Sequence, residues 1–329
     1  MAAGAAYYVL LYRPAHQTPP EIAYVLPKSA EVWDSTAEVR AVVGRVEHGD
    51  RLEVFERTRN WARVRLERED YGWVEKKDLL DAGTYEAGQQ LLNKLRESSA
   101  QAAGHTVNVV NLRLEPSRDA PVLAQLDDRE GVEVFGRRLI EPITQARPPA
   151  TSEPGSASAG ESPAPSSLAR EAWYLIRAGS KAGWAIGRLV ELDVPESIAE
   201  YAQGFNLVAW LELNRVEDDG RQVPQYFVAD RLGTQELDFN HIRVLTWGTQ
   251  NRRYATAYVE SNLGGYFPVR VGQVKGIPHF RLRLMDGKGH KFQKVYGLFG
   301  TITRVIGTVD GWDSDAMPTQ PVPRRRRVH

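Results

Sequence analysis

The chain has 329 residues, with 42 Lys and Arg balanced by 42 Asp and Glu, and it is 26% charged and 42% hydrophobic, which is typical of a globular protein. Zero net charge excludes the basic or acidic excess that supports bulk binding to nucleic acid or membranes. The absence of cysteine excludes disulfides, thiolate metal sites and cysteine nucleophiles, and it is compatible with the cytosol and with an oxidising envelope alike.

Residues 1–21 are predicted to be a flexible N-terminus. The first 12 residues are largely apolar, but a membrane-spanning helix needs about 20 such residues. The stretch also lacks the basic region and the cleavage site of a secretory signal. No other run is longer, so we expect no transmembrane segment.

A sequence repeat organises the first two thirds of the chain. Residues 43–56 recur as 123–136 at an offset of 80, and the segment that begins at Trp61 recurs at Trp173 at an offset of 112. The repeat predicts two copies of one small domain, at 22–81 and 105–204. The change in offset predicts about 32 additional residues inside the second copy.

Those additional residues are visible in the composition of 141–170, which is dominated by Pro, Ser, Ala and Gly. A segment with so few large apolar side chains cannot offset the entropy of ordering, so it is predicted to be a disordered insert. Lengthening a loop in this way costs only about 2 kcal/mol, so the second copy can still close around it.

Each copy alternates apolar and polar residues over four to six positions, with turn residues between the runs, which predicts short antiparallel strands. The motifs at 44–54, 61–64 and 71–74 resemble the bacterial SH3 (SH3b) domain family, and 111–116 and 183–184 carry a weaker form of them. The resemblance implies two small SH3-like β-barrels, arranged as in tandem SH3b proteins of the cell envelope. It also implies an envelope or periplasmic location, although without an evident signal peptide a cytoplasmic one is also possible.

Two short helices are predicted as connections. Residues 84–101 place Ala87, Leu91, Leu92 and Leu95 on one helical face, within a connecting segment at 82–104. Residues 195–203 begin with Pro and are followed by Gly, which is the expected asymmetry of helix ends.

Residues 205–309 return to a period of two and predict about eight short strands, in an antiparallel β sandwich or barrel. The strands are expected at 206–212, 225–229, 242–247, 254–260, 266–271, 279–285, 292–298 and 301–306. Residues 310–329, with three prolines before four arginines, are predicted to be a disordered basic tail. The whole chain is therefore expected to be mainly β.

No catalytic or metal-binding pattern is present. The seven histidines form no H-E-x-x-H, and the chain contains no G-x-S-x-G, S-x-x-K or G-x-G-x-x-G. The carboxylates at 217–219 fit a hairpin turn, and Asp310, Asp313 and Asp315 lack the terminal Glu of a calcium loop. We therefore expect no enzyme activity, no cofactor and no metal.

Aromatic residues of the repeat are the candidate ligand-binding residues, because they recur in both copies and an aromatic groove can bind peptides. These residues are Trp61, Tyr71, Trp73, Trp173, Tyr174 and Trp184. Tyr71 is the strongest candidate, since its hydroxyl tolerates water. For Trp73 and Trp184 the favoured interpretation is that they are mainly core residues, which fix the last turn of each barrel.

Two functions are consistent with these features. The first is a non-enzymatic envelope protein whose SH3b-like modules bind cell-wall peptide or peptidoglycan, as the resemblance implies. The second is a protein interaction scaffold that acts through the C-terminal β domain, with the SH3b-like pair as a spacer. Nucleic acid is not an expected partner, because the Arg and aromatic alternation near 252–258 is that of any half-exposed strand. The sequence specifies no oligomeric state.

Overall fold

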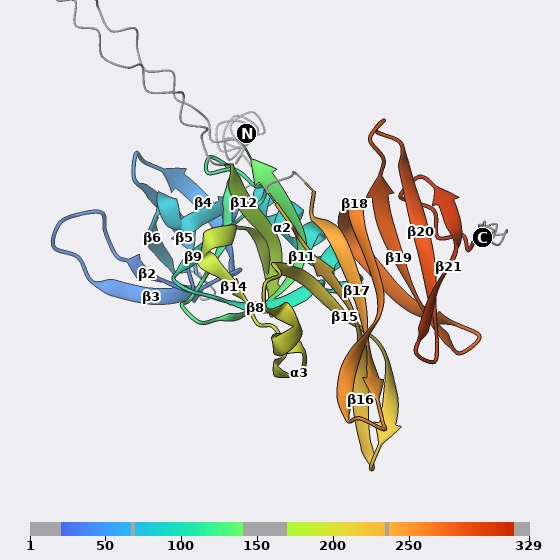
Figure 1. Ribbon diagram of the computed structural model, residues 1–329. Helices are drawn as coiled ribbons and strands as arrows, with labels where there is room; N and C mark the ends of the chain where they lie inside the picture. Colours follow the sequence, from blue (N-terminus) through green and yellow to red (C-terminus); the bar gives the residue numbers. More distant parts are fainter. Residues whose placement is uncertain (1–20, 67–69, 141–169, 234–236, 319–329) are drawn as a thin grey trace, which may run out of the picture. The chain divides into compact units, whose positions relative to one another are not determined.

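The computed structural model describes residues 21–66, 70–140, 170–233 and 237–318. The expectations for 1–20, for 141–169 and for 319–329 lie outside these residues. The described residues form three seven-stranded antiparallel sheets and two α-helices (Figure 1), which confirms a mainly β chain with two short helices. The chain divides into two compact units, residues 1–90 with 121–125 and residues 91–120 with 126–329.

The first sheet, called the first β domain below, contains the strands in the order β3-β2-β6-β5-β4-β1-β7. Its strands are β1 (Glu21–Val25), β2 (Ser29–Trp33), β3 (Val42–Glu47), β4 (Arg51–Arg57), β5 (Trp61–Arg65), β6 (Tyr71–Glu75) and β7 (Leu79–Asp81). Alternate residues face one core, in which Val32, Ala62, Val64 and Val74 are fully buried. The intervening residues therefore form the outer face of the sheet.

The second sheet, the second β domain, repeats this topology strand for strand, in the order β10-β9-β13-β12-β11-β8-β14. Its strands are β8 (Ala102–Thr106), β9 (Val110–Arg113), β10 (Val122–Leu126), β11 (Gly131–Ile140), β12 (Glu171–Ala178), β13 (Lys181–Ile186) and β14 (Val190–Leu192). The repeat found in the sequence is therefore a repeat of structure.

A glycine at the same place in each copy shows how closely the two sheets correspond. A Cβ atom on Gly72 would lie 2.3 Å from Val32 Cγ1, and a Cβ atom on Gly183 would lie 2.9 Å from Leu112 Cβ. Val32 and Leu112 occupy equivalent strands, β2 and β9. In both sheets a glycine is needed at this position because the neighbouring strand approaches the backbone too closely for a side chain.

Helix α2 spans Ala82–Arg96 and is shorter than the 84–101 helix predicted from the sequence. The Asp81 side chain accepts hydrogen bonds from the backbone N–H and the hydroxyl of Thr84, which fixes the start. At the other end, the Ser98 hydroxyl donates to the Lys94 carbonyl. The chain then enters β8 at Ala102, so the second β domain begins earlier than the predicted residue 105.

A second short helical segment follows β14. Helix α3 (Glu196–Ala199) continues into a 3₁₀ turn at Glu200–Ala202, within the predicted 195–203. Ile198 is fully buried, so the segment is held by its apolar side chain rather than by its length.

The third sheet is a simple meander in which the strands follow chain order, from β15 to β21. Its strands are β15 (Leu207–Asp218), β16 (Arg221–Asp230), β17 (Phe239–Gly248), β18 (Arg253–Val274), β19 (Ile277–Met285), β20 (Lys291–Phe299) and β21 (Ile302–Asp310). The described residues therefore make seven strands here, not eight, because the predicted strands 254–260 and 266–271 are two parts of β18.

Strand β18, drawn in orange in Figure 1, pairs with β17 through its first half and with β19 through its second half. Gly265 lies at the change, where a Cβ atom would lie 2.2 Å from the ring of Phe239. The two halves of the sheet share one core, in which the Phe227 and Phe280 rings lie 5.0 Å apart. The domain is thus one seven-stranded antiparallel sheet whose two halves share a core.

Candidate functional site

The outer face of the first β domain carries aromatic rings and arginines in alternation with the buried core residues. We call it the aromatic–arginine face. It consists of Trp33, Phe55, Trp61, Tyr71 and Trp73 together with Arg40, Arg63 and Arg65. Three of the six predicted site residues, Trp61, Tyr71 and Trp73, therefore share one surface.

The tryptophans lie at one end of this face. Trp33 on β2 and Trp73 on β6 are cross-strand partners. The Arg40 guanidinium lies 4.5 Å from the Trp33 ring centroid and 4.7 Å from the Trp61 ring centroid. A cation between two indole rings holds them in place, and each such contact contributes about 0.5–1 kcal/mol at an exposed site.

Phe55 and Tyr71 form the other end of the face. Their rings meet edge to face with centroids 5.3 Å apart, and Phe55 is 46% and Tyr71 44% exposed. Arg63 lies over the Tyr71 ring at 5.1 Å, and Arg65 lies over the Phe55 ring at 5.7 Å. Two large aromatic side chains held open to water by fixed neighbours are a feature of binding surfaces.

The charge on this end is partly balanced. Glu53 forms an ion pair with Arg65, in which Glu53 Oε2 lies 2.5 Å from Arg65 Nη2. The two residues are cross-strand partners on β4 and β5. Arg63 is exposed and pairs in register with Trp73 on β6. The face therefore offers apolar rings beside guanidinium groups, which suits a ligand with apolar side chains and oxygen acceptors.

The three predicted site residues of the second β domain do not form a matching surface. Trp173 is only 1% exposed and is a core residue, which excludes it from a binding groove. Tyr174 is the next residue on β12 and points to the opposite side of the sheet. Trp184 is half-buried and pairs in register with Arg113. Only the first copy thus presents the aromatic residues together.

The sequence analysis missed five members of the face, Trp33, Phe55, Arg40, Arg63 and Arg65. Phe55 lies within the register shift between Val54 and Glu56. Its ring is on the outer face because it alternates with the buried Leu52 and Val54 along β4. The alternation of Trp61, Arg63 and Arg65 around the buried Ala62 and Val64 was the available signal.

The C-terminal domain contains a buried cluster of Arg243, Asp230 and His241 that connects neighbouring segments of the chain. Arg243 donates two hydrogen bonds to the Asp230 carboxylate, and His241 Nδ1 lies 2.8 Å from the same group. Arg243 also donates to the Tyr201 carbonyl at 2.6 Å and lies over the Phe205 ring. Arg243 thereby connects the 3₁₀ turn at Glu200–Ala202 to the third sheet.

A second cluster surrounds Glu260. Its carboxylate accepts hydrogen bonds from the hydroxyls of Tyr258 and Tyr296 and from Lys294. Burial acts to raise the pKa of Glu260, but hydrogen bonds from Lys294 and both tyrosines together hold that pKa below its usual value. Burial raises the pKa of Tyr296. A lowered pKa keeps Glu260 ionised at neutral pH, and a raised pKa keeps Tyr296 protonated. Neither group changes its protonation state near neutral pH, so the cluster is poorly suited to acid–base catalysis.

The second β domain contacts the C-terminal domain within one unit. The Gln101 side chain is fully buried; its amide donates to the Val269 carbonyl and its carbonyl accepts from the Val269 N–H. Arg137 donates to the Leu237 carbonyl at 3.2 Å. Beside it, burial raises the pKa of Asp238 to about 6, and a hydrogen bond from the Phe267 N–H only partly offsets that effect.

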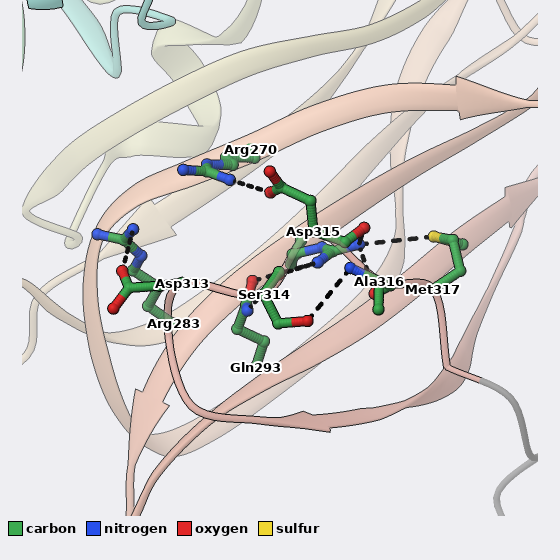
Figure 2. A network of polar contacts seen from close by, with 9 residues as sticks. Arg270, Arg283, Gln293, Asp313, Ser314, Asp315, Ala316 and Met317 are labelled. Atoms are coloured by element: carbon green, nitrogen blue, oxygen red, sulfur yellow. Dashed lines mark hydrogen bonds and ion pairs between the residues drawn. The ribbon is translucent and has the colours of Figure 1, made fainter.

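Residues 311–318, called the C-terminal strap, are the described part of the predicted 310–329 tail and contact β18 and β19. Figure 2 shows Asp313 turned toward Arg283 and Asp315 turned toward Arg270, and these pairs are ion pairs. Arg281 donates to the Ser314 carbonyl at 2.6 Å. The strap is ordered because its acidic residues and carbonyls meet arginines on β18 and β19.

Trp312 anchors the start of the strap. Its indole N–H donates to the Leu284 carbonyl at 2.8 Å, and its ring lies 5.0 Å from the Tyr266 ring. The aspartates do not converge on a cation, because Asp310 contacts His290 while the other two contact arginines. Among the described residues no group of His, Asp and Glu is arranged to hold a metal ion, and no described helix is long and apolar enough to cross a membrane.

Comparison with known proteins adds little to this geometry. No protein-family model and no curated protein matches the chain. Among solved structures, NlpC2 from Trichomonas vaginalis aligns at 9% identity over 75% of this chain and 99% of that chain, with a TM-score of 0.18. NlpC1 from the same organism aligns at 9% over 92% and 96%, with a TM-score of 0.19.

A further solved structure, an NlpC/P60 family protein from Bacillus cereus, aligns at 10% identity over 73% of this chain and 99% of that chain, with a TM-score of 0.22. TM-scores of this size establish neither a shared fold nor a shared activity. The functional argument therefore rests on the aromatic–arginine face.

Proposed function

We propose that the protein is a non-enzymatic binding protein whose first β domain binds a peptide ligand through the aromatic–arginine face. The observation that carries the proposal is the exposed Phe55–Tyr71 pair, which Arg63 and Arg65 hold in place. Aromatic rings with adjacent guanidinium groups are enriched in interface hot spots.

The SH3b resemblance makes a cell-wall peptide the first ligand class to test. Stem peptides carry carboxylates and apolar side chains, which complement Arg63 and the Tyr71 ring. The C-terminal domain, in this proposal, is the part that the binding domain localises.

Co-sedimentation of the full chain with purified sacculi, and with sacculi stripped of their stem peptides by an amidase, tests the proposal. We expect the full chain to be retained by intact sacculi and released when the stem peptides are removed. Tyr71→Ala should lose retention. Phe299→Ala is the matched control, because Phe299 is a similarly exposed aromatic residue, 41% exposed, on the C-terminal domain.

The same pair of variants tests the alternative of a scaffold that acts through the C-terminal domain. That alternative is favoured by the apolar tip of the β20–β21 hairpin, where the cross-strand partners Phe299 and Ile302 are both exposed. If sacculi no longer retain the Phe299→Ala variant but still retain the Tyr71→Ala variant, the C-terminal domain is the part that binds and the proposal is wrong.

A further inference from the structure

The second β domain shows what the outer face of such a sheet can bind. In the first domain Glu53 pairs with Arg65 and Val54 with Val64, and a register shift follows. In the second domain Glu133 pairs with Arg177 and Val134 with Ile176, and a register shift follows at the same place. The two faces can therefore be compared residue by residue, and Phe55 corresponds to Phe135.

One trio of side chains is the same in both domains. Arg65 lies 5.7 Å from the Phe55 ring and forms a 2.5 Å ion pair with Glu53. Its counterpart Arg177 lies 5.1 Å from the Phe135 ring and forms a 2.5 Å ion pair with Glu133. The chemistry of the face is thus duplicated together with the fold.

The two trios differ in what covers them. Phe135 is 5% exposed, because Leu92 and Leu95 from the last turns of α2 pack against it together with Ala182. Arg177 also donates a hydrogen bond to the carbonyl of Leu95 at 3.2 Å. The last carbonyls of a helix have no partner within the helix, so this arginine satisfies one of them.

No described helix packs in this way on Phe55. Ala182 of the second domain corresponds to Tyr71, since each pairs with the arginine of its trio. The Tyr71 ring adds apolar area at the place where α2 lies in the second domain. The first domain therefore presents the same receptor surface for a helix end, enlarged by one aromatic ring.

We infer that the aromatic–arginine face also binds the C-terminal end of an amphipathic α-helix supplied by another protein. Two apolar side chains three residues apart pack on Phe55 and Tyr71, as Leu92 and Leu95 pack on Phe135. Arg65 donates to a carbonyl of the last helical turn, as Arg177 does. The inference rests on the proposed function, in that it uses the same face and adds a second class of ligand.

The charge of Arg63 indicates which side chains the partner helix carries beside its apolar pair. Arg63 stands where the second domain has Leu175, which packs against the α2 cluster. An exposed arginine in place of a leucine favours a helix with a carboxylate beside its apolar pair.

The test is a titration of the full chain with a synthetic helical peptide of the α2 sequence, residues 82–101, followed by fluorescence anisotropy. Two control peptides are matched to it. One carries Leu92→Ser and Leu95→Ser, which removes the apolar pair. The other carries Gln90→Pro, which breaks the helix and keeps both leucines.

We expect saturable binding of the unmodified peptide, and binding weakened about tenfold or more by either peptide change and by Phe55→Ala in the protein. Arg65→Gln should weaken binding less than Phe55→Ala, and Phe299→Ala should leave it unchanged. Circular dichroism of each protein variant verifies its fold.

Three outcomes would overturn the inference. No binding up to about 1 mM peptide excludes a helical ligand of this type. Equal binding of the Gln90→Pro peptide shows that the face takes an extended ligand. Binding that needs removal of residues 1–20 shows that the chain itself supplies the occupant. If sacculi still retain the full chain through Tyr71 in any of these cases, the proposed function stands without the helix; if they do not, both are wrong.

Discussion

Phe55 and Phe135 hold the same position on the same strand in two copies of one sheet, and each lies beneath an arginine that is paired with a glutamate. The second copy buries its phenylalanine under α2, whereas the first leaves it 46% exposed. The comparison separates what a residue does for folding from what it does for binding. Identical local chemistry stabilises the second domain and is available to a ligand in the first.

The largest expected effect is the difference between Phe135→Ala and Phe55→Ala. Removing the buried ring of Phe135 leaves a cavity beside Leu92 and Leu95 and should lower the free energy of unfolding by about 3–5 kcal/mol. Removing the exposed ring of Phe55 should cost less than about 1 kcal/mol. Urea unfolding of the two variants measures both. Similar losses in the two variants would show that the copies do not differ in burial.

The next effect concerns the arginines that follow the bulges. Arg57 forms an exposed ion pair with Glu21, whereas its counterpart Arg137 is buried near Asp238. Burial raises the pKa of Asp238 from 3.8 to about 6, so the folded state binds the proton more tightly than the unfolded chain does. The free energy of unfolding should therefore fall by up to about 3 kcal/mol as pH rises through this window.

Urea unfolding of the second unit between pH 3.5 and pH 7 checks this prediction, with Asp238→Asn as the control. The amide cannot titrate and can still accept the hydrogen bond from the Phe267 N–H, so its contribution should not vary with pH. An unchanged slope in Asp238→Asn would assign the pH dependence to other groups.

A smaller effect should be equal in the two copies. Gly72→Ala and Gly183→Ala each bring a Cβ atom against a neighbouring strand, at Val32 and Leu112 respectively. Each substitution should lower the free energy of unfolding by about 1–3 kcal/mol. Gly131→Ala is the control, because no atom lies within 4 Å of its added Cβ. Stability that responds to only one of the two glycines would contradict the structural equivalence.

The smallest expected effect is on the ion pairs. Glu53→Gln and Glu133→Gln remove the carboxylate of each trio, and both pairs are partly exposed to solvent. Each change should cost about 1 kcal/mol or less. The cost should be larger for Glu133→Gln, because Arg177 also holds the end of α2. Thermal unfolding at low and high salt measures the stability cost of each substitution. A larger cost for Glu53→Gln would show that the ion pair of the first trio contributes more to stability than that of the second.

The sequence allowed the duplication to be predicted because Gly-Trp pairs, turn residues and alternating strands recur at fixed offsets. It did not reveal that α2 packs on the outer face of the second copy and leaves Phe55 of the first copy exposed. Trp173 was predicted as a site residue with Trp61, yet Trp173 is buried and Trp61 is half-buried. The sequence pattern around the two tryptophans does not distinguish them. It also did not predict that Asp313 and Asp315 of the C-terminal strap form ion pairs with Arg283 and Arg270, which lie far away in the chain.

The most direct test of the central claim is hydroxyl-radical footprinting of the full chain, with and without its ligand, read by mass spectrometry at Phe55, Tyr71 and Phe135. The account predicts rapid oxidation of Phe55 and Tyr71 in the free protein, protection of both when the sacculi or the α2 peptide is bound, and protection of Phe135 throughout. Protection of Phe55 in the free protein, or oxidation of Phe55 that a bound ligand leaves unchanged, would contradict it.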